Sequence, residues 1–308
     1  MWRYVVKRLI TLIPLLLAVS FIVFFLMSFT GDPALTLAGD GASKEDIENI
    51  RESLGLNDPL IVRYARHMWK FFHGDMGTTL YGTSVWDNYI ARFPNTLKLA
   101  VAAMIVSVVI SIPFGILAAV KHNSWIDNAL SATALCGVSL PGFWLGLMMM
   151  VLFSVKLGWL PSSGDTTWKH LIMPAICLGL DKAAGLTRTT RSAMVDVIRA
   201  DYLRTARAKG VSERDVIAKH AFRNALVTIM TTMGAQFVQL ISGASVIESL
   251  FAYNGLGCYV VESIRGNEFT AATNTIIIFA IMCALILLCV DVLYAFVDPR
   301  IKARYTRK

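Results

Sequence analysis

The chain has 308 residues, of which 56% are hydrophobic and only 16% are charged. Soluble domains average about 25% charged residues, so this chain has too few polar side chains to cover a water-exposed surface. A disordered chain is excluded because it needs low hydrophobicity and high charge. A disulfide scaffold is excluded because the five cysteines are scattered. The composition therefore indicates a membrane protein with several spans.

Five windows without Asp, Glu, Lys or Arg are each long enough for a spanning helix, which needs about 20 apolar residues. These windows are Leu9–Gly31, Leu99–Val120, Asn128–Val155, Asn224–Ile247 and Phe269–Val290. A sixth, weaker span covers about 168–187 and contains Asp181 and Lys182. The apolar runs lack the period-2 alternation of barrel strands. The sequence therefore predicts an all-α polytopic membrane protein with six transmembrane helices, the first a retained anchor rather than a signal peptide.

The net charge of +8 comes from Lys and Arg on one side of the predicted bundle. They occur near the N-terminus, at Lys121, between Arg188 and Arg223, and from Arg300 onward. The positive-inside rule makes this side cytoplasmic, so both termini are expected in the cytoplasm of a cell bounded by this membrane. The opposite side carries residues 31–94, where acidic residues outnumber basic ones. The basic excess marks topology, and no nucleic-acid partner is expected.

Two connections between spans are long enough to fold. In the external segment 31–94, Ser43 followed by Asp46 is a capping-box pattern that predicts a helix over about 44–54, and a second helix is expected over about 59–73. This segment is predicted to form a small subdomain against the first two spans.

The second long connection lies on the cytoplasmic side. After Met194, apolar or small residues recur at helical spacing, at Val195, Ile198, Tyr202 and Ala206. Gly210 ends this pattern, and Ser212 with Asp215 begins a second helix that continues into the fifth span. The sequence predicts a helix–glycine turn–helix hairpin at about 194–223. Without further information, a basic helix under a membrane more often contacts lipid.

The chain lacks the motifs of common enzyme sites. It contains no P-loop, no His-Glu-x-x-His, no Cys-x-x-Cys and no Gly-x-Ser-x-Gly. His67, His73 and Asp75 match no standard metal-ligand spacing. No catalytic residue, metal site or bound cofactor is therefore expected, and any active transport must draw energy from a partner or an ion gradient.

A long string in the hairpin resembles a known family. It reads Asp201-Tyr202-Leu203-Arg204-Thr205-Ala206-Arg207-Ala208-Lys209-Gly210, followed by His220-Ala221-Phe222-Arg223-Asn224. This is similar to the coupling segment, or EAA loop, of permease subunits of bacterial ABC importers, and specifically of the dipeptide, oligopeptide and nickel permease family. Other matching strings are Gly31-Asp32-Pro33, Gly74-Asp75-Met76-Gly77, Ser139-Leu140-Pro141 and Trp159-Leu160-Pro161. Tyr253-Asn254 departs from the Trp-Pro that the family usually carries.

The resemblance implies a type I ABC importer permease fold, with the external segment 31–94 typical of the first-named permease of a pair. Its parts would be an N-terminal transmembrane helix at 1–30, the external subdomain at 31–94, the permease domain at 95–297 and a basic cytoplasmic tail at 298–308. The residues implied to contact an ATPase are Asp201, Tyr202, Thr205, Ala206, Ala208, Gly210, His220, Arg223 and Asn224.

The implied partners are a second homologous permease, one or two ABC ATPase subunits that bind the ATP and Mg, an external binding protein, and membrane lipid. The implied location is the bacterial cytoplasmic (inner) membrane. Small peptides are the expected substrate, with nickel chelates or glutathione as the alternative.

Several alternatives remain open at this stage. Asp181 and Lys182 are neighbours expected on different helix faces, and they either line a pathway or form a structural pair at a helix interface. Asp291, near the end of the last span, is expected to make a structural hydrogen bond. A stand-alone channel or a gradient-driven carrier would work without an ATPase and without residues 194–223, and a membrane-embedded enzyme would need a catalytic cluster that the sequence does not provide.

Overall fold

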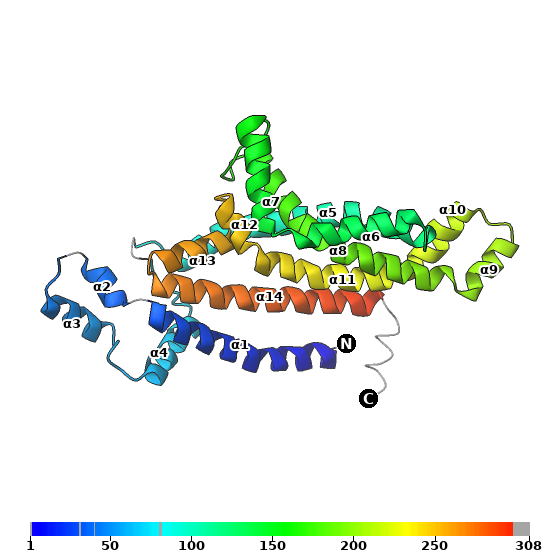
Figure 1. The fold of residues 1–308 in the computed structure, drawn as a ribbon. Helices are drawn as coiled ribbons and strands as arrows, with labels where there is room; N and C mark the ends of the chain where they lie inside the picture. The colour runs from blue at the N-terminus through cyan, green and yellow to red at the C-terminus, as the bar shows by residue number, and fades with distance from the viewer. Residues whose placement is uncertain (1, 31, 40, 80–81, 298–308) are drawn as a thin grey trace. The chain divides into compact units, whose positions relative to one another are not determined.

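The computed structural model describes residues 2–30, 32–39, 41–79 and 82–297 (Figure 1). The prediction of an all-α protein is confirmed, because the extended pairing in these ranges is a single bridge between Thr78 and Ser84. The chain divides into two compact units. The N-terminal unit comprises residues 2–96 and 254–285, and the central unit comprises residues 97–253 and the end of the last helix. The predicted basic tail at 298–308 lies outside the described residues.

The N-terminal unit is built on one long apolar helix and several shorter amphipathic ones. Its helices are α1 (Trp2–Thr30), α2 (Pro33–Ala38), α3 (Lys44–Ser53), α4 (Leu60–Phe72), the beginning of α5 (Val85–Val120), α13 (Leu256–Arg265) and the beginning of α14 (Phe269–Val297). Its core contains Met68 and Phe71 of α4, Tyr89 of α5, Leu256 of α13 and Ile277 of α14. The segment between the first two predicted spans is thus tied to the span helices by buried side chains.

The two helices predicted in this segment are confirmed. The capping box at the start of α3 is complete, because the Ser43 hydroxyl accepts a hydrogen bond from the Asp46 amide and the Asp46 carboxylate accepts one from the Ser43 amide. Helix α4 buries Met68 and Phe71, which lie three positions apart on one side of it.

The central unit holds the remaining helices. They are the rest of α5, α6 (Trp125–Ser139), α7 (Gly142–Met149), the π-helix η1 (Met150–Lys156), α8 (Lys169–Ile198), α9 (Asp201–Ala208), α10 (Glu213–Asp215), the π-helix η2 (Val216–Ala221), α11 (Phe222–Gly243) and α12 (Ser245–Leu250). Helix α8 is central to this unit because it packs against α6, α7 and α11.

Small residues let α5 and α8 approach closely in the central unit. A Cβ atom added at Gly179 would lie 2.7 Å from the Ala103 carbonyl oxygen, and one added at Gly115 would lie 2.5 Å from the Thr190 Cβ. The Ser111 hydroxyl donates a hydrogen bond of 2.8 Å to the Ala183 carbonyl in the same buried interface. Such small-residue contacts are typical of helix packing in membranes, where there is little hydrophobic force between helices.

Four helices of the described ranges are long and apolar enough to cross a membrane. They are Leu9–Thr30, Val85–Val120, the continuous run Glu213–Gly243, and Phe269–Val290. The predicted window Asn128–Val155 is not one helix, which corrects the expectation of a single third span. It is divided at Leu140, whose extended backbone (φ −90°, ψ 124°) is the conformation favoured before a proline such as Pro141. The predicted sixth span lies within α8, and the count of six spans stays a prediction.

Candidate functional site

The predicted cytoplasmic hairpin is present, but its first arm is not continuous. Helix α8 ends at Ile198, Ala200 is extended (φ −72°, ψ 143°), and α9 begins at Asp201. The expectation of one helix from Met194 to the glycine turn is therefore wrong. The reason lies in the packing. Helical spacing from Ile198 would place Tyr202 on the apolar face, but Tyr202 is 44% exposed, and its neighbour Leu203 is fully buried instead. The break moves the buried face forward by one residue.

The second arm of the hairpin agrees with the prediction. Ser212 caps it by accepting a hydrogen bond from the Asp215 amide, and the helical run then continues through η2 into α11. Beneath the hairpin lies an apolar cluster that includes Met194, Leu203, Val216, Ala221 and Ala225. The two arms are thus held together by their own buried core.

The side chains predicted to couple to an ATPase form the outer surface of this hairpin. Asp201, Tyr202, Thr205, Ala208, Gly210, His220, Arg223 and Asn224 are exposed, and Ala206 is half-buried against the apolar cluster. Two of these residues meet across the arms, because the Asn224 side-chain amide donates a hydrogen bond of 2.8 Å to the Tyr202 hydroxyl. The same amide group donates to the His220 carbonyl at 2.9 Å. The structure therefore brings Tyr202, His220 and Asn224 together at the base of the hairpin.

The tip of the hairpin is closed by charge and by a glycine. Arg207 donates two hydrogen bonds to the Glu213 carboxylate, at 3.0 and 2.9 Å, and this contact lowers the pKa of Glu213. Gly210 has φ +79°, a conformation in which a Cβ is unfavourable, and no atom lies within 4 Å of where its Cβ would be. The turn therefore needs glycine for its backbone conformation, while the space around it is open.

An ion pair that sequence reasoning missed fixes α8 next to the hairpin. Arg191 of α8 contacts both carboxylate oxygens of Asp127, with Nε–Oδ1 at 2.6 Å and Nη2–Oδ2 at 2.7 Å. The Asn123 amide donates to the same carboxylate at 3.0 Å, and His122 Nδ1 lies 3.1 Å from Arg191 Nη2. The Asp127 side chain is 2% exposed and that of Arg191 is 29% exposed. The first turn of α6 and α8 are joined by a buried charge pair, two turns of helix before the end of α8.

The pKa of Asp127 lies well below its usual range because its carboxylate accepts hydrogen bonds from Arg191 and from the Asn123 amide. A carboxylate with a lowered pKa in the folded state stabilises that state at all pH values above its unfolded pKa. This contribution is lost only as the pH falls below about 4, toward the lower pKa of the folded state. The pair is therefore fully charged at neutral pH.

Asp181 and Lys182 do not diverge as expected. The Lys182 amino group lies 2.7 Å from the Asp181 carboxylate, because the long lysine side chain reaches back to its neighbour. The Gln236 side-chain amide of α11 donates to the Lys182 carbonyl at 3.3 Å. The two side chains thus form a pair with each other next to the α8–α11 contact, and their placement along a pathway stays a prediction. The Asp291 side chain lies outside the described residues.

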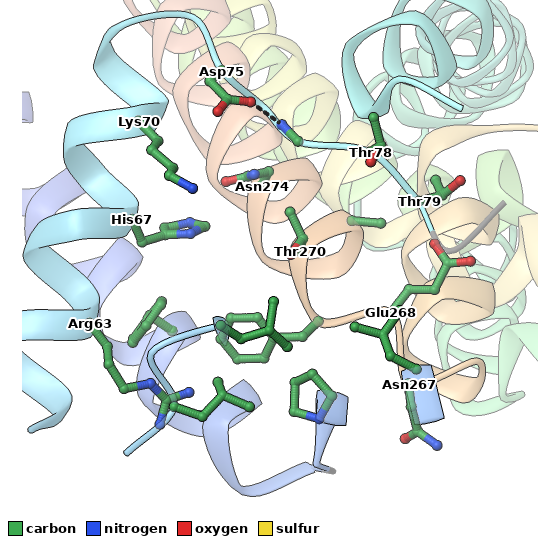
Figure 2. Close-up of a pocket in the computed structure, with 18 of the residues that line it drawn as sticks. Arg63, His67, Lys70, Asp75, Thr78, Thr79, Asn267, Glu268, Thr270 and Asn274 are labelled. Atoms are coloured by element: carbon green, nitrogen blue, oxygen red, sulfur yellow. Dashed lines mark hydrogen bonds between the residues drawn. The ribbon is translucent and has the colours of Figure 1, made fainter. Parts of the chain in front are cut away.

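A cavity of about 570 Å³ opens in the N-terminal unit. Figure 2 shows Arg63, His67 and Lys70 of α4 on one side and Asn267 and Glu268, which precede α14, on the other. Cavities of roughly 300–1,000 Å³ are the size that holds small molecules. The lining carries both cationic groups and the carboxylates of Glu268 and Asp75, the latter near Lys70, so it suits a ligand that carries both charges.

Burial shifts the pKa values of two groups that line this cavity. Burial lowers the pKa of His67 to about 4, so its ring is neutral at physiological pH. The pKa of Glu268 is raised by burial. Gly77 approaches α14 so closely that a Cβ would lie 2.6 Å from Thr270 Cγ2, and the Asn274 amide donates to the Met76 carbonyl at 2.8 Å. The loop 74–79 is thereby held against α14, where it forms one side of the cavity.

Comparison with protein families identifies two matching models. Residues 111–303 match the binding-protein-dependent transport system inner membrane component, and residues 1–100 match the N-terminal component of the same systems. A relative in Brucella abortus named as a peptide transport system permease is 40% identical over 98% of this chain and 99% of its own length. The glutathione transport system permease protein GsiC of Escherichia coli K12 is 41% identical over the same shares.

Solved structures show a similar fold. A chain of the MetNI methionine ABC transporter, in an inward-facing conformation, matches with a TM-score of 0.60 and 20% identity. The match covers 68% of this chain and 96% of that one. A chain of an amino acid ABC transporter matches with a TM-score of 0.50 and 16% identity, over 70% of this chain and 94% of its own. At these identities the likeness concerns the fold alone.

Proposed function

The chain belongs to the family of binding-protein-dependent transport system inner membrane components, and on this premise we propose that it carries small peptides across the inner membrane. The observation that supports this most directly is the identity of about 40% to permeases named for peptide and glutathione transport, over nearly their full length. Glutathione is itself a small peptide, so both names point to one class of substrate. Nickel chelates are the alternative cargo.

The energy for transport comes from partner ATPases in this proposal. The hairpin exposes three small residues, Thr205, Ala208 and Gly210, that permit a partner surface to approach closely. One or two ATPase subunits bind these residues on the cytoplasmic side and hydrolyse ATP with Mg, while this chain contributes no catalytic group. A second, homologous permease completes the pathway, and both termini of this chain lie in the cytoplasm.

The mechanism is alternating access. Closure of the ATPases moves the hairpin, and the second arm passes this motion into the membrane because it is continuous with α11. An external binding protein delivers the peptide to the segments on the opposite side, including residues 31–94 and 251–268. The cavity beside α4 supports a peptide as cargo, because a free peptide has a positive amino end and a negative carboxyl end, and the cavity lining offers both carboxylates and cationic side chains.

A graded series at Gly210 tests the coupling proposal. If the turn conformation is what matters, asparagine, which tolerates φ > 0, keeps more uptake than alanine, although its side chain is larger. If close approach to the ATPase is what matters, alanine keeps more uptake than asparagine. Valine is expected to fail in both cases, because it is both β-branched and bulky. The measurements are peptide uptake and co-purification of the ATPase with the tagged chain.

The matched control is Ser212→Gly on the same turn, which keeps a capping residue at a cost of only a few tenths of a kcal/mol. Normal uptake and normal ATPase recovery with Gly210→Val would show that the hairpin tip does not couple transport. Uptake that survives without any ATPase in the purified complex would contradict the ATP-driven mechanism itself. Uptake of a nickel chelate but not of peptides would replace the proposed cargo and leave the coupling intact.

A further inference from the structure

Helix α4 has two different faces. Its buried side contributes Met68 and Phe71 to the core of the N-terminal unit. A second stripe exposes large apolar side chains at positions eight and then three residues apart, which helical geometry places on one side of the helix. Ile61 is 72% exposed, Trp69 is 68% exposed and Phe72 is 70% exposed. Groups of exposed large apolar side chains often mark a surface that contacts a membrane or another protein.

Contacts with α1 fix where α4 lies along that helix. The Tyr64 hydroxyl is 2.7 Å from the Ser20 hydroxyl and donates to the Leu17 carbonyl at 3.2 Å. The Tyr64 ring packs edge-on against Phe21 at 5.1 Å and against Phe24 at 5.6 Å. Helix α4 is therefore docked on the stretch 17–24 of α1, and not beyond the end of α1.

This stretch is well inside the apolar part of α1. The helix exposes large apolar side chains from Leu9 through Phe29, and few residues of its apolar part are buried. At about 1.5 Å per residue, Leu17 and Ser20 lie roughly 14–18 Å before Phe29 along the helix axis. The hydrocarbon core is about 30 Å thick. If the apolar surface of α1 is in lipid, the Tyr64 hydroxyl reaches the middle of the hydrocarbon core, and α4, which carries this side chain, cannot stand clear of the bilayer.

We infer that α4 is a membrane-interface helix, which lies along the bilayer surface with Ile61, Trp69 and Phe72 in contact with lipid. Figure 1 shows α4 crossing α1 at a steep angle, as a helix parallel to the membrane plane would cross a span. Such helices bury their apolar face about 5–10 Å below the headgroups, and Trp is enriched at this depth. The external segment is then partly an in-plane membrane element.

The charged residues of α4 are compatible with this depth. Arg66 forms an ion pair with Asp58, and Arg63 lies over the Phe24 ring at 6.0 Å. Arg63, Arg66 and Lys70 all line the cavity and not the exposed apolar stripe. The three charges are therefore turned toward protein groups and the cavity, and the apolar stripe is free to meet the acyl chains.

Spin labelling in bilayers distinguishes lipid from water and from protein. Single cysteines are placed at Ile61→Cys, Trp69→Cys and Phe72→Cys in the full chain, with the native cysteines replaced and the complex reconstituted in liposomes. Collision rates are measured with oxygen, which concentrates in lipid, and with a nickel chelate, which stays in water. Glu45→Cys on α3 is the water control, and Leu26→Cys on α1, where leucine is 58% exposed, is the lipid control.

The inference expects the three α4 labels to match Leu26→Cys, with a high oxygen rate and a low nickel rate. A ratio like that of Glu45→Cys would place the stripe in water and overturn the inference. Low rates for both reagents would mean that a protein partner covers the stripe, which also overturns it. Only variants whose complex retains wild-type uptake are measured. Misfolded protein then does not contribute, and the collision rates report the surroundings of the apolar stripe.

Discussion

Breaking the Asp127–Arg191 pair is expected to destabilise the central unit by an amount that depends on which partner is removed. The carboxylate is 2% exposed and the guanidinium 29% exposed. Removing one member of a buried pair costs about 3–5 kcal/mol, because the other charge stays buried without a partner. In Arg191→Met the stranded group is the buried carboxylate, so the full cost applies, at the low end because Asn123 still donates to it. In Asp127→Asn the stranded guanidinium can turn toward water, and we expect a cost of about 1–2 kcal/mol.

The double variant Asp127→Asn with Arg191→Met removes both charges. It is expected to recover part of the loss of Arg191→Met, because no buried ion remains. The pH dependence gives a second check on the same reasoning. The pKa of Asp127 is lowered in the folded state, so its stabilising contribution is constant from about pH 5 to 8 and falls only below about pH 4. In Arg191→Met the carboxylate loses its main partner, its pKa rises, and the stability begins to depend on pH nearer to neutrality.

The assay is thermal unfolding in mild detergent with a thiol-reactive dye, in a background where the other cysteines are replaced so that the dye reports the exposure of the buried Cys177 in the same unit. At roughly 2–4 °C per kcal/mol, Arg191→Met is expected to lower the apparent melting temperature by about 6–12 °C. Lys219→Met is the control, because Lys219 pairs with Asp215 on the exposed surface, where such pairs contribute about 0–1 kcal/mol. Equal losses for Asp127→Asn and Arg191→Met would refute the argument from unequal burial.

Three further outcomes follow from single contacts. Gly115→Val is expected to prevent the close approach of α5 and α8, so that no folded protein is recovered by size-exclusion chromatography. Adding Thr190→Ala should not restore folding, because alanine keeps the Thr190 Cβ that the new side chain would clash with. Tyr202→Phe removes the hydroxyl that accepts from Asn224 and should cost about 1 kcal/mol in thermal unfolding, whereas wild-type stability would mean that this bond does not hold the arms. Ser43→Ala removes a cap worth about 1 kcal/mol and should speed hydrogen exchange in the first turn of α3 without changing the rest of the chain.

Features that depend on neighbouring residues could be predicted from the sequence. The capping box at Ser43, the ends of α3 and α4, the glycine turn at 210 and the Ser212 cap are local, and all are present. The helical class also follows from length and composition, since a bilayer leaves a continuous apolar run few other solutions. The division of the third window was predictable in principle, because Pro141 constrains the residue before it.

Features that depend on distant residues could not be predicted in the same way. Asp127 and Arg191 are 64 positions apart, and nothing in the spacing of charges marks these two among the others. The break before α9 has no glycine or proline, and it depends on burying Leu203 in a core assembled from α8, η2 and α11. The meeting of Asp181 with Lys182 contradicts a rule for ideal side-chain directions, because a lysine is long enough to bend back.

The two arms of the hairpin differ in how they can transmit a displacement. The first arm is interrupted at Ala200, so α9 can move relative to α8 by changing a few backbone angles. Arg191, a short distance before this break, ties α8 to Asp127 in the first turn of α6 and resists such motion in α8 itself. The second arm has no interruption between Glu213 and Gly243. We therefore expect a displacement of α9 to pass mainly into α11, to which α9 is linked by the bond between Tyr202 and Asn224.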